Sequence, residues 1–578
     1  MGQNIKNVLG VTIDGKHFGI FAPTGSNWNS SFPLISDLNG KDFLSIAVLP
    51  DSSQVTFNLF KNHAYAFVED TKAHWSYNAK TNQVEIDYEV TTTLMESNES
   101  TSNNTLQALY RHQWLNTSND ITNLSYQSPR GEMKVMNANT FTTNNSFVGI
   151  LPFLPDLGDY NRIELNQYLN EVASQPIVTS SDSYNSGKEM GKYAQLVHIA
   201  DQLGDLKAKN TLLFQLKLAL ENWLTAGGSQ QYYYDQDWKV LIGFPASHGS
   251  NLRLNDQHFH HGYTIYAAAT VAKFDSIWAS NENWGSMINL LIKNASNWDR
   301  KDHKFPYLRN FDIYAGHSWA SGDGSWFVGN NQESSSESMN YAASVFLWGE
   351  ITGQYNIRDL GAYLYTIESE AINQYWFDVD EEVFPEEFEQ TAVGMVTGSG
   401  AIHGTWFSSA VEKIHGINFL PITAGSMYLG TNPDYVQKNY NSIVEKRGSE
   451  PISWKDILWS YLAFYDSELA LSHFYNDKDY QVFDGETKAR TMHWLHNLKV
   501  LGQVNSEVQA DIASYNVFVN SNNDTTYVAY NSDPSTKKVT FTNGFSFDVQ
   551  GNELKAYNKS MFKEKELFSG CLIFRRIS

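Results

Sequence analysis

Residues 331–349, NQESSSESMNYAASVFLWG, open with two acidic side chains and continue as an apolar run that predicts a helix. Glu333 and Glu337 are four residues apart, so on a helix both lie on one face near its N-terminus. Acidic residues in a first turn complement the helix dipole and cap free N–H groups. The same pair also suits acid–base chemistry, and the surrounding sequence has to decide between the two interpretations.

Helical patterns surround this stretch on both sides. Leu196, Ile199, Ala200 and Leu203 follow an i, i+3, i+4, i+7 spacing, and the same period recurs between long loops rich in Gly, Asn, Asp and Trp. Further helices are predicted at residues 213–223, 265–272, 287–298, 341–352, 357–376 and 457–474. Many helices joined by elaborate loops are typical of an α/α toroid, whose loops line a cleft at one end.

The two ends of the chain predict β-structure instead. Apolar and acidic residues alternate at 84–90, VEIDYEV, and short apolar runs with polar turns continue to about residue 155, which favours a β-sandwich. Near the C-terminus, Asn543 and Gly544 separate two alternating runs and predict a hairpin with a type I′ turn.

The composition indicates a large folded protein suited to a neutral substrate. Of 578 residues, 42% are hydrophobic and 14% are aromatic, which is enough for packed cores and leaves rings for stacking on sugars. The net charge of −22 disfavours nucleic acids and anionic membranes as partners. Cys571 is the only cysteine, which excludes intrachain disulfides and a thiolate metal site. No apolar stretch of about 20 residues predicts a membrane span, and no signal-peptide pattern is evident.

A second candidate stretch is NDQHFHHGY, residues 255–263. Asp256 and His260 are four residues apart, and the neighbouring histidines suggest zinc, but the sequence lacks an H-E-x-x-H pattern and a second ligand cluster. Two alternatives remain. Either Asp256 caps the following helix while His260 packs in the core, or Asp256 is a protonated carboxylic acid that His260 orients.

A third stretch, FPYLRNFDIYAGHSWASG at 305–322, crowds aromatic and hydrogen-bonding side chains together, as a sugar subsite requires and as a well-packed loop also does. These side chains are Arg309, Asp312, Tyr314, His317 and Trp319. The sequence has no G-x-S-x-G elbow, Walker loop or Rossmann fingerprint. Carboxylates on separate loops remain, and glycoside hydrolysis usually requires two carboxylates that flank a glycosidic bond.

Together these stretches resemble glycoside hydrolase family 81, the inverting endo-β-1,3-glucanases. The resemblance extends to YYYDQDWKVLIGFP at 232–245, IHGINFLPITAGSMYLG at 414–430 and several N-terminal motifs, so it covers nearly the whole chain in the family's order. It implies a multidomain α+β fold. Its parts are a β-sandwich at 1–155, an α/β connecting region at 156–233, an (α/α)6 barrel with the cleft at 234–505, and a β segment at 506–578 that packs back on the body.

The resemblance also implies site residues. Asp256 matches the general acid and Glu333 the general base of a single-displacement mechanism, and Glu337 and His260 complete the catalytic set with less defined roles. Inversion needs room for a water molecule, so we expect the two carboxyl groups to be roughly 6.5–9.5 Å apart. No metal or cofactor is implied. The implied substrate-binding residues are Asp235, His258, Tyr263, Asp312, Tyr314, His317, Trp319, Asn331, His403 and His415.

The sequence departs from the family pattern in three places. Gln257 and His261 replace a His and a Tyr of the family's Asp motif. Met1 lies inside the expected sandwich, whose first strands are usually further upstream. Residues 569–578, which include Cys571, match nothing in the family pattern.

Rival functions stay open at this point. A non-catalytic glucan-binding protein is one alternative, and a toroid polysaccharide lyase fits less well because lyases need cationic or neutralising groups that face a uronate carboxylate. We expect a monomer that binds β-1,3-glucan polysaccharide, without nucleic-acid or membrane partners. An extracellular location is expected for the native product, while the lack of a signal-peptide pattern keeps a cytoplasmic location open.

Overall fold

The computed structural model describes residues 7–29, 33–97, 101–179 and 182–558. Cys571 and the unmatched tail at 569–578 lie outside these residues. The chain divides into two compact units. The first contains the described residues up to Ser76, with Glu85–Asn145 and Glu382–Phe384. The second contains Tyr77–Val84, Ser146–Glu381 and the described residues from Pro385 onward.

The first unit begins with an antiparallel three-stranded sheet and a helix. Its strands are β1 (Val8–Ile13), β2 (Lys16–Phe21) and β3 (Ser45–Leu49), in that order, and the helix is α1 (Gln54–His63). Val8, Phe21 and Leu49 project from one face of the sheet and form a core with Phe57 of α1. Because side chains alternate along each strand, the residues between them project from the opposite face.

That opposite face is also apolar. Phe18 pairs with Val11 and Val48, and Ile20 pairs with Leu9 and Ile46. Ile46 is 63% exposed and Val48 51% exposed. Residues that are paired directly across strands share a face, so these six side chains form one apolar surface that is partly open to solvent.

The remaining strands of this unit form two further sheets. One has the order β4 (Ala66–Asn78), β5 (Gln83–Leu94) and β9 (Thr140–Ser146). The other has the order β6 (Leu106–Leu109), β8 (Gly131–Asn137) and β7 (Ser125–Ser128), with the short helix α2 (Arg111–Trp114) after β6. The predicted strand at 84–90 lies in β5, where Val84, Ile86 and Tyr88 are buried and the acidic residues between them are exposed.

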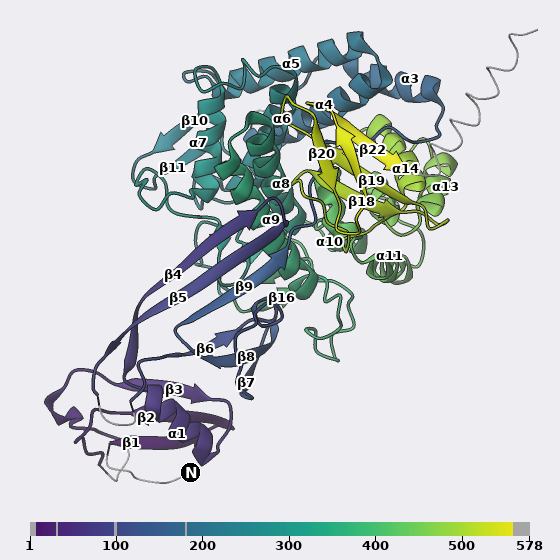
Figure 1. The fold of residues 1–578 in the computed structure, drawn as a ribbon. Helices are drawn as coiled ribbons and strands as arrows, with labels where there is room; N and C mark the ends of the chain where they lie inside the picture. Colours follow the sequence, from purple (N-terminus) through teal and green to yellow (C-terminus); the bar gives the residue numbers. More distant parts are fainter. Residues whose placement is uncertain (1–6, 30–32, 98–100, 180–181, 559–578) are drawn as a thin grey trace, which may run out of the picture. The chain divides into compact units, whose positions relative to one another are not determined.

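Helices dominate the second unit (Figure 1). They are α3 (Arg162–Ala173), α4 (Ser183–Leu203), α5 (Leu206–Leu224), α6 (Gln257–Phe274), α7 (Gly285–Ser296), α8 (Ser335–Thr352), α9 (Tyr355–Tyr375), α10 (Val411–Gly416), α11 (Pro433–Arg447), α12 (Lys455–Leu462), α13 (Ser467–Asn476) and α14 (Lys488–Leu501). Helix α6 packs between α4 and α8, and α8 packs between α6 and α9. Almost every residue of α6 and α8 is buried, so this pair forms the centre of the helical core.

Glycines allow the central helices to approach closely. A Cβ atom at Gly361 of α9 would lie 2.3 Å from the backbone nitrogen of Phe346 in α8. A Cβ atom at Gly262 of α6 would lie 2.9 Å from the Cα atom of Tyr341 in α8. Neither position has room for a larger side chain unless the backbone moves, which makes α8 closely held from two sides.

The predicted helix at 457–474 is wrong in one respect, because the structure divides it into α12 and α13. The break falls at Asp466, whose carboxylate accepts a hydrogen bond from the backbone N–H of Leu469 at 2.9 Å. This side chain caps a new helix within an otherwise continuous apolar pattern.

Short strand pairs occupy the loops between the helices. They are β10 (Gln231–Asp235) with β11 (Val240–Phe244), β12 (Phe311–Asp312) with β13 (His317–Ser318), and a three-stranded sheet of β14 (Asn331–Gln332), β15 (Met395–Thr397) and β16 (Gly400–Ile402). The last sheet joins the segment before α8 to a hairpin that lies more than 60 residues further along the chain.

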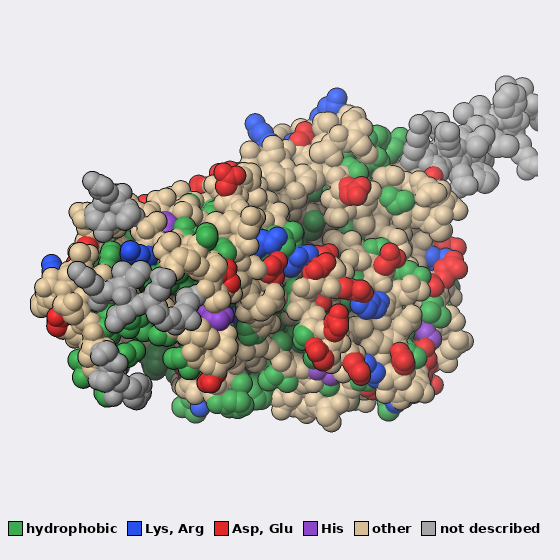
Figure 2. Space-filling view, turned by 90° about the horizontal axis from the view of Figure 1, so that it is seen from below, with side chains coloured by type: hydrophobic (Ala, Val, Ile, Leu, Met, Phe, Trp, Pro, Cys, Tyr) green, Lys and Arg blue, Asp and Glu red, His purple; other side chains and the backbone are tan. Residues whose placement is uncertain are grey.

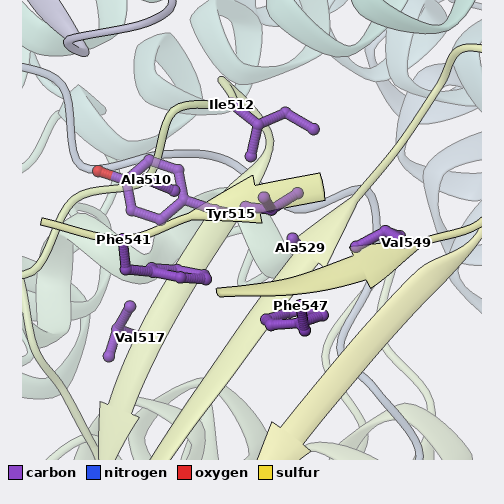
Figure 3. Close-up of a cluster of buried hydrophobic side chains, with 9 residues drawn as sticks. Ala510, Ile512, Tyr515, Val517, Ala529, Phe541, Phe547 and Val549 are labelled. Atoms are coloured by element: carbon purple, nitrogen blue, oxygen red, sulfur yellow. The ribbon is translucent and has the colours of Figure 1, made fainter. Parts of the chain in front are cut away.

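The C-terminal residues form a sheet with the order β17 (Gln503–Val504), β18 (Tyr515–Val519), β19 (Thr525–Tyr530) and β22 (Leu554–Asn558), and a hairpin of β20 (Lys537–Thr540) and β21 (Ser546–Val549). Tyr515, Phe541 and Phe547 pack in the core that joins the sheet to the hairpin (Figure 3). The hydroxyl group of Tyr515 donates to the carbonyl of Phe147 at 3.1 Å.

The hairpin prediction is confirmed, but the predicted type I′ turn is wrong. The backbone N–H of Phe541 donates to the carbonyl of Phe545 at 2.8 Å, and the backbone N–H of Gly544 donates to the carbonyl of Phe541 at 2.8 Å. Gly544 has a φ of 86°, whereas Asn543 is not among the residues with positive φ. A type I′ turn requires positive φ at both central residues, so this loop instead fits a three-residue connection that ends at a left-handed glycine.

No helix in the described ranges combines the length and the apolar character that a membrane crossing requires. Acidic side chains are scattered over the face seen in Figure 2, with Lys and Arg among them. This distribution agrees with the net charge of −22.

Candidate active site

A cavity of about 380 Å³ opens in the helical unit, where the loop before α6 meets the loops before α8 and after β16. Its walls combine carboxylates with aromatic rings. The lining residues are Tyr184, His248, Asn255, Asp256, Phe259, Ala320, Trp326, Asn331, Glu333, Ser334, Glu337, Trp406, Phe407 and Ile417. Three carboxylates therefore face one enclosed space.

Asp256 stands at the N-cap position of α6 in a left-handed conformation, with a φ of 59°. Its backbone N–H donates to the carbonyl of Ala320 at 2.8 Å, and within the described part of the chain its carboxylate makes no capping hydrogen bond. Burial raises the pKa of Asp256 well above its usual range, and the charges of Glu337 and Glu333 add to the rise. The prediction that the Asp256 side chain caps α6 is therefore wrong, and the raised pKa favours the protonated form of this carboxyl group at the cavity wall.

Glu333 lies between β14 and the N-cap of α8, Ser334. One carboxylate oxygen, Oε1, accepts a hydrogen bond from the backbone N–H of Trp406 at 2.7 Å. The pKa of Glu333 is raised to about 7, chiefly by burial; the backbone N–H of Trp406 opposes the rise, and the charge of Glu337 adds to it. At neutral pH this group exchanges readily between its acidic and basic forms.

Glu337 lies in the first turn of α8 and is buried. Its Oε1 atom accepts a hydrogen bond from the hydroxyl group of Tyr263 at 2.8 Å, and burial together with the charge of Glu337 raises the pKa of the nearby Tyr184. The prediction that Glu333 and Glu337 share one helical face is wrong for Glu333, because the helix begins only at Ser335. The two side chains meet at the cavity because the chain turns into α8 between them.

His260 is buried one turn into α6, and its Nδ1 atom lies 2.9 Å from the hydroxyl group of Ser183. The pKa of His260 is lowered to about 3, chiefly by burial and in smaller part by the nearby His248, which favours the neutral ring. Its ring lies 5.3 Å from that of Tyr184, centroid to centroid. His260 therefore supports a ring of the cavity wall. Its backbone N–H donates to the carbonyl of Asp256 at 3.0 Å, whereas in the described residues its ring makes no hydrogen bond to the Asp256 carboxyl group.

The sequence model of the family described as "Glycosyl hydrolase family 81 C-terminal domain" matches residues 160–496. A protein named glucan endo-1,3-beta-D-glucosidase from Acetivibrio thermocellus is 44% identical over 586 aligned residues, which cover 99% of this chain and 74% of the relative. The chain belongs to glycoside hydrolase family 81. A second relative with the same name, from Thermobifida fusca, is 42% identical, and the match covers 95% of this chain and 72% of the relative.

A solved structure of a family 81 glycoside hydrolase from Clostridium thermocellum, in a mutant form, superposes on this chain with a TM-score of 0.93. The two sequences are 43% identical, and the match covers 96% of this chain and 78% of the other. The predicted resemblance is thereby confirmed, as is a multidomain fold of mixed helix and sheet. The β-sandwich, the (α/α)6 barrel and the three predicted domain boundaries stay predictions.

Two further residues expected from the family 81 resemblance lie at the carboxylates. Asn331 lines the cavity, and its Oδ1 atom accepts a hydrogen bond from the indole Nε1 of Trp406 at 3.2 Å. Tyr263 stands behind the wall on α6 and donates to Glu337. The bond between Trp406 and Asn331 fixes side chains beside Glu333, the candidate base. The bond from Tyr263 fixes the carboxylate of Glu337.

The expected aspartates and their neighbours organise turns next to the site. Asp235 accepts hydrogen bonds from the backbone N–H groups of Asp237 and Trp238 at 3.0 and 2.9 Å. Asp312 accepts from the backbone N–H groups of Tyr314 at 3.1 Å and Ala315 at 3.0 Å. The indole of Trp319 also donates to Asp312, at 3.2 Å. These residues are not among the described residues that line the cavity, and their substrate-binding roles stay predictions.

The expected histidines lie behind the wall or further along the same loops. His258 bonds to the hydroxyl group of Ser318 at 3.2 Å, and His317 bonds to the carbonyl of Ser318 at 2.8 Å. His403 contacts the carbonyl of Ala392 and His415 contacts Asn439, at 2.9 and 2.6 Å. Within the described ranges no group of three or more His, Cys, Asp or Glu side chains is arranged to hold a metal ion.

Sequence reasoning missed the aromatic part of the wall. Tyr184, Trp326, Trp406 and Phe407 all line the cavity. Trp406 and Phe407 are 52% and 54% exposed, and they follow one another in a segment rich in Gly, Ser and Thr. An adjacent pair of large rings in such a polar loop is a usable signal, since loops of this kind rarely have a core to fill.

Proposed function

We propose that this family 81 chain hydrolyses internal β-1,3-glucosidic linkages in β-1,3-glucan. The observation that carries the proposal is that Asp256 and Glu333, from separate loops, face one cavity and both have a raised carboxyl pKa. The names of the two relatives support the same reaction. Perturbed carboxylates in a shared cavity are what acid–base catalysis on a glycosidic bond requires.

We assign the role of general acid to Asp256. Its carboxyl group stays protonated because it is partly buried and because it shares the cavity with two other carboxylates. It therefore has a proton to donate to the leaving oxygen of the sugar. Glu337 contributes through its charge, which adds to the rise in the pKa of Asp256, and its carboxylate is held by the hydrogen bond from Tyr263.

We assign the role of general base to Glu333. With a pKa of about 7 its carboxylate is ionised in mildly alkaline solution and is basic enough to take a proton from water. Its Oε1 atom is held by Trp406, which leaves Oε2 to orient the water. A single displacement then inverts the anomeric carbon, and the roughly 6.5–9.5 Å separation of the two carboxyl groups remains part of the proposal.

The walls suit a neutral sugar polymer. Trp326, Trp406 and Phe407 offer ring faces on which pyranose rings stack, and the carboxylates and Asn331 offer hydrogen-bond partners. The net charge of −22 repels polyanions such as uronates, which disfavours the lyase alternative. Because a polysaccharide is too large to cross a membrane, we infer that the chain acts outside the cell.

The test compares laminarin hydrolysis by the wild type, Asp256→Asn and Glu333→Gln. We expect each variant to release reducing ends about 10²–10⁴-fold more slowly, since each loses one proton-transfer step. Both should still bind laminarin oligosaccharides in calorimetry, because the aromatic wall is unchanged. Equal rates from all three proteins contradict the assignment, and an inactive wild type that binds glucan supports the non-catalytic alternative.

The stereochemistry is tested by proton NMR of the first product. An inverting enzyme releases the α-anomer before mutarotation, whereas a retaining enzyme releases the β-anomer. Initial β-anomer would overturn the single-displacement mechanism and leave hydrolysis itself intact. Absorbance from unsaturated product ends would instead favour a lyase.

A further inference from the structure

We propose that Trp406 is a positioning residue, which couples stacking of a sugar ring on its indole to the orientation of Glu333 and to the spacing between Glu333 and Asp256. This inference rests on the proposed function, because it assigns how the base of that reaction is held. Trp406 lies in the loop after β16, 73 residues beyond Glu333 in the sequence.

The loop is tied to the segment of the base by the sheet β14–β15–β16. Asn331 pairs with Thr397 and Gln332 with Val396, and Glu333 follows directly after this strand. The hairpin β15–β16 then leads into the Trp406 loop, whose turn is closed by the hydroxyl group of Thr405, which donates to the carbonyl of Ser408 at 2.8 Å. The base and the indole are therefore carried by one small sheet.

Two hydrogen bonds of Trp406 converge on that strand. Its backbone N–H donates to Oε1 of Glu333 at 2.7 Å, and its indole Nε1 donates to Oδ1 of Asn331 at 3.2 Å. The side-chain bond thus fixes the loop whose backbone holds the base. Both acceptors lie within three residues of each other, so a shift of the indole is transmitted to Glu333.

The same strand is bonded to the candidate acid. The carbonyl of Asn331 accepts from the backbone N–H of Ala320 at 2.8 Å, and the carbonyl of Ala320 accepts from the backbone N–H of Asp256 at 2.8 Å. A continuous path of hydrogen bonds therefore runs from Trp406 through Asn331 and Ala320 to Asp256. This path sets the distance across which the acid and the base act.

The indole is also placed to meet the substrate. It is 52% exposed, lines the cavity, and its ring centroid lies 5.0 Å from that of Trp326. The guanidinium of Arg253 covers the Trp326 ring at 4.8 Å, so Trp326 is held in turn. A sugar ring that stacks on the Trp406 indole therefore contacts the same residue whose backbone N–H orients Glu333.

The decisive variant is Trp406→Phe, which keeps a six-membered aromatic ring and the backbone N–H and removes the pyrrole part of the indole with its N–H donor. We expect kcat to fall about 3–10-fold while KM changes less than twofold, which corresponds to losing one hydrogen bond that acts through the base. The acidic limb of the kcat/KM profile should move to higher pH by about 0.5–1 unit, because a backbone N–H that bonds less well stabilises the ionised carboxylate less.

Asn331→Ala removes the acceptor of the same hydrogen bond and should shift the acidic limb in the same direction. If the two residues act through one bond, the double variant should be no slower than the slower single variant. Additive losses in kcat, or an unmoved acidic limb in Trp406→Phe, would overturn the proposal. Circular dichroism of each variant checks that the fold is retained.

Phe407→Leu is the matched control. Phe407 is the next residue, is 54% exposed and lines the same cavity, and no hydrogen bond from it to Glu333 or Asn331 is found in the described residues. This variant should raise KM without moving the acidic limb. An equal shift in Phe407→Leu would show that any disturbance of the loop suffices, which contradicts a specific role of Trp406.

The outcome is separable from that of the proposed function. If the wild type is active and the acidic limb does not move in Trp406→Phe, the result contradicts the role of Trp406 and leaves the proposed function intact. If the wild type is inactive on laminarin, the pKa of Glu333 can be followed by ¹³C NMR in glutamate-labelled protein, with Glu333→Gln to assign the signal. That pKa must still be higher in Trp406→Phe than in the wild type, and an unchanged value overturns the inference.

Discussion

Three carboxylates around one cavity are unfavourable for stability, since like charges in a partly buried space repel each other. The chain reduces this repulsion at individual residues. Burial raises the pKa of Asp256 well above its usual range, the pKa of Glu333 is raised to about 7, and Glu337 accepts a hydrogen bond from Tyr263. The different surroundings of Asp256 and Glu333 raise the pKa of two similar side chains by different amounts, which is how acid and base roles are separated.

The titration of Glu333 predicts the pH dependence of the reaction. The base must be ionised, and its pKa is raised to about 7, so kcat/KM should fall about tenfold per unit as the pH decreases below 7. Initial rates on laminarin between pH 5 and pH 9 measure this limb. An acidic limb near the ordinary glutamate value of about 4.3 would show that Glu333 is not the group whose ionisation limits the rate.

At the scale of elements, the site depends on how closely α8 is packed. Its first turn carries Glu337, and its neighbours α6 and α9 contact it where glycines replace side chains. Gly361 faces the backbone of Phe346, and Gly262 faces the backbone of Tyr341. Helices that approach this closely leave α8 little freedom to shift, and this holds Glu337 at its hydrogen bond with Tyr263.

Gly361→Ala should therefore destabilise the protein. The new methyl group would lie 2.3 Å from the backbone nitrogen of Phe346, so α8 and α9 must separate, at a cost of about 1–3 kcal/mol. Thermal or urea unfolding measures the loss. Gly400→Ala is the control, because nothing lies within 4 Å of its Cβ position and its φ is not positive. Equal stability of both variants would mean that the helices adjust without strain.

At the scale of the whole molecule, acidic charge and one apolar surface have opposite effects on association. The net charge of −22 makes copies of the chain repel each other. The sheet β1–β2–β3 presents Ile46 and Val48 to solvent beside Phe18 and Ile20. Exposed apolar patches of this kind promote contact with other apolar surfaces.

The double variant Ile46→Thr/Val48→Thr should weaken the contact of this sheet surface with other apolar surfaces. Threonine keeps the β-branched shape that strands favour and replaces a methyl group of Val48 and the ethyl group of Ile46 with a hydroxyl group. We expect weaker binding of the dye ANS and less light scattering at high protein concentration, with laminarin hydrolysis unchanged. Val55→Thr is the control, since Val55 is 80% exposed but lies on α1. If the double variant binds as much dye as the wild type, the sheet face is not the accessible apolar surface.

Local patterns in the sequence were sufficient for most elements of secondary structure. The spacing at 196–203 predicts the buried face of α4, and the alternation at 84–90 predicts β5, because each period reflects one buried face. The division of 457–474 by Asp466 and the turn at Asn543 were predicted less well. Both depend on a few local hydrogen bonds, which alter the backbone without changing the hydrophobic pattern.

The sequence by itself also determined the family and the carboxylates that define the candidate site, because long motifs keep residue type and order together. Only the tertiary structure decided that Trp406 and Asn331 meet beside Glu333, and that Asp256 faces the cavity rather than capping α6. Asp312 lies in a polar and aromatic stretch that also suggested a sugar subsite, yet in the structure its carboxylate organises a turn. The physical reason is that local patterns record which faces are buried, whereas the meeting of distant loops depends on how the helices pack.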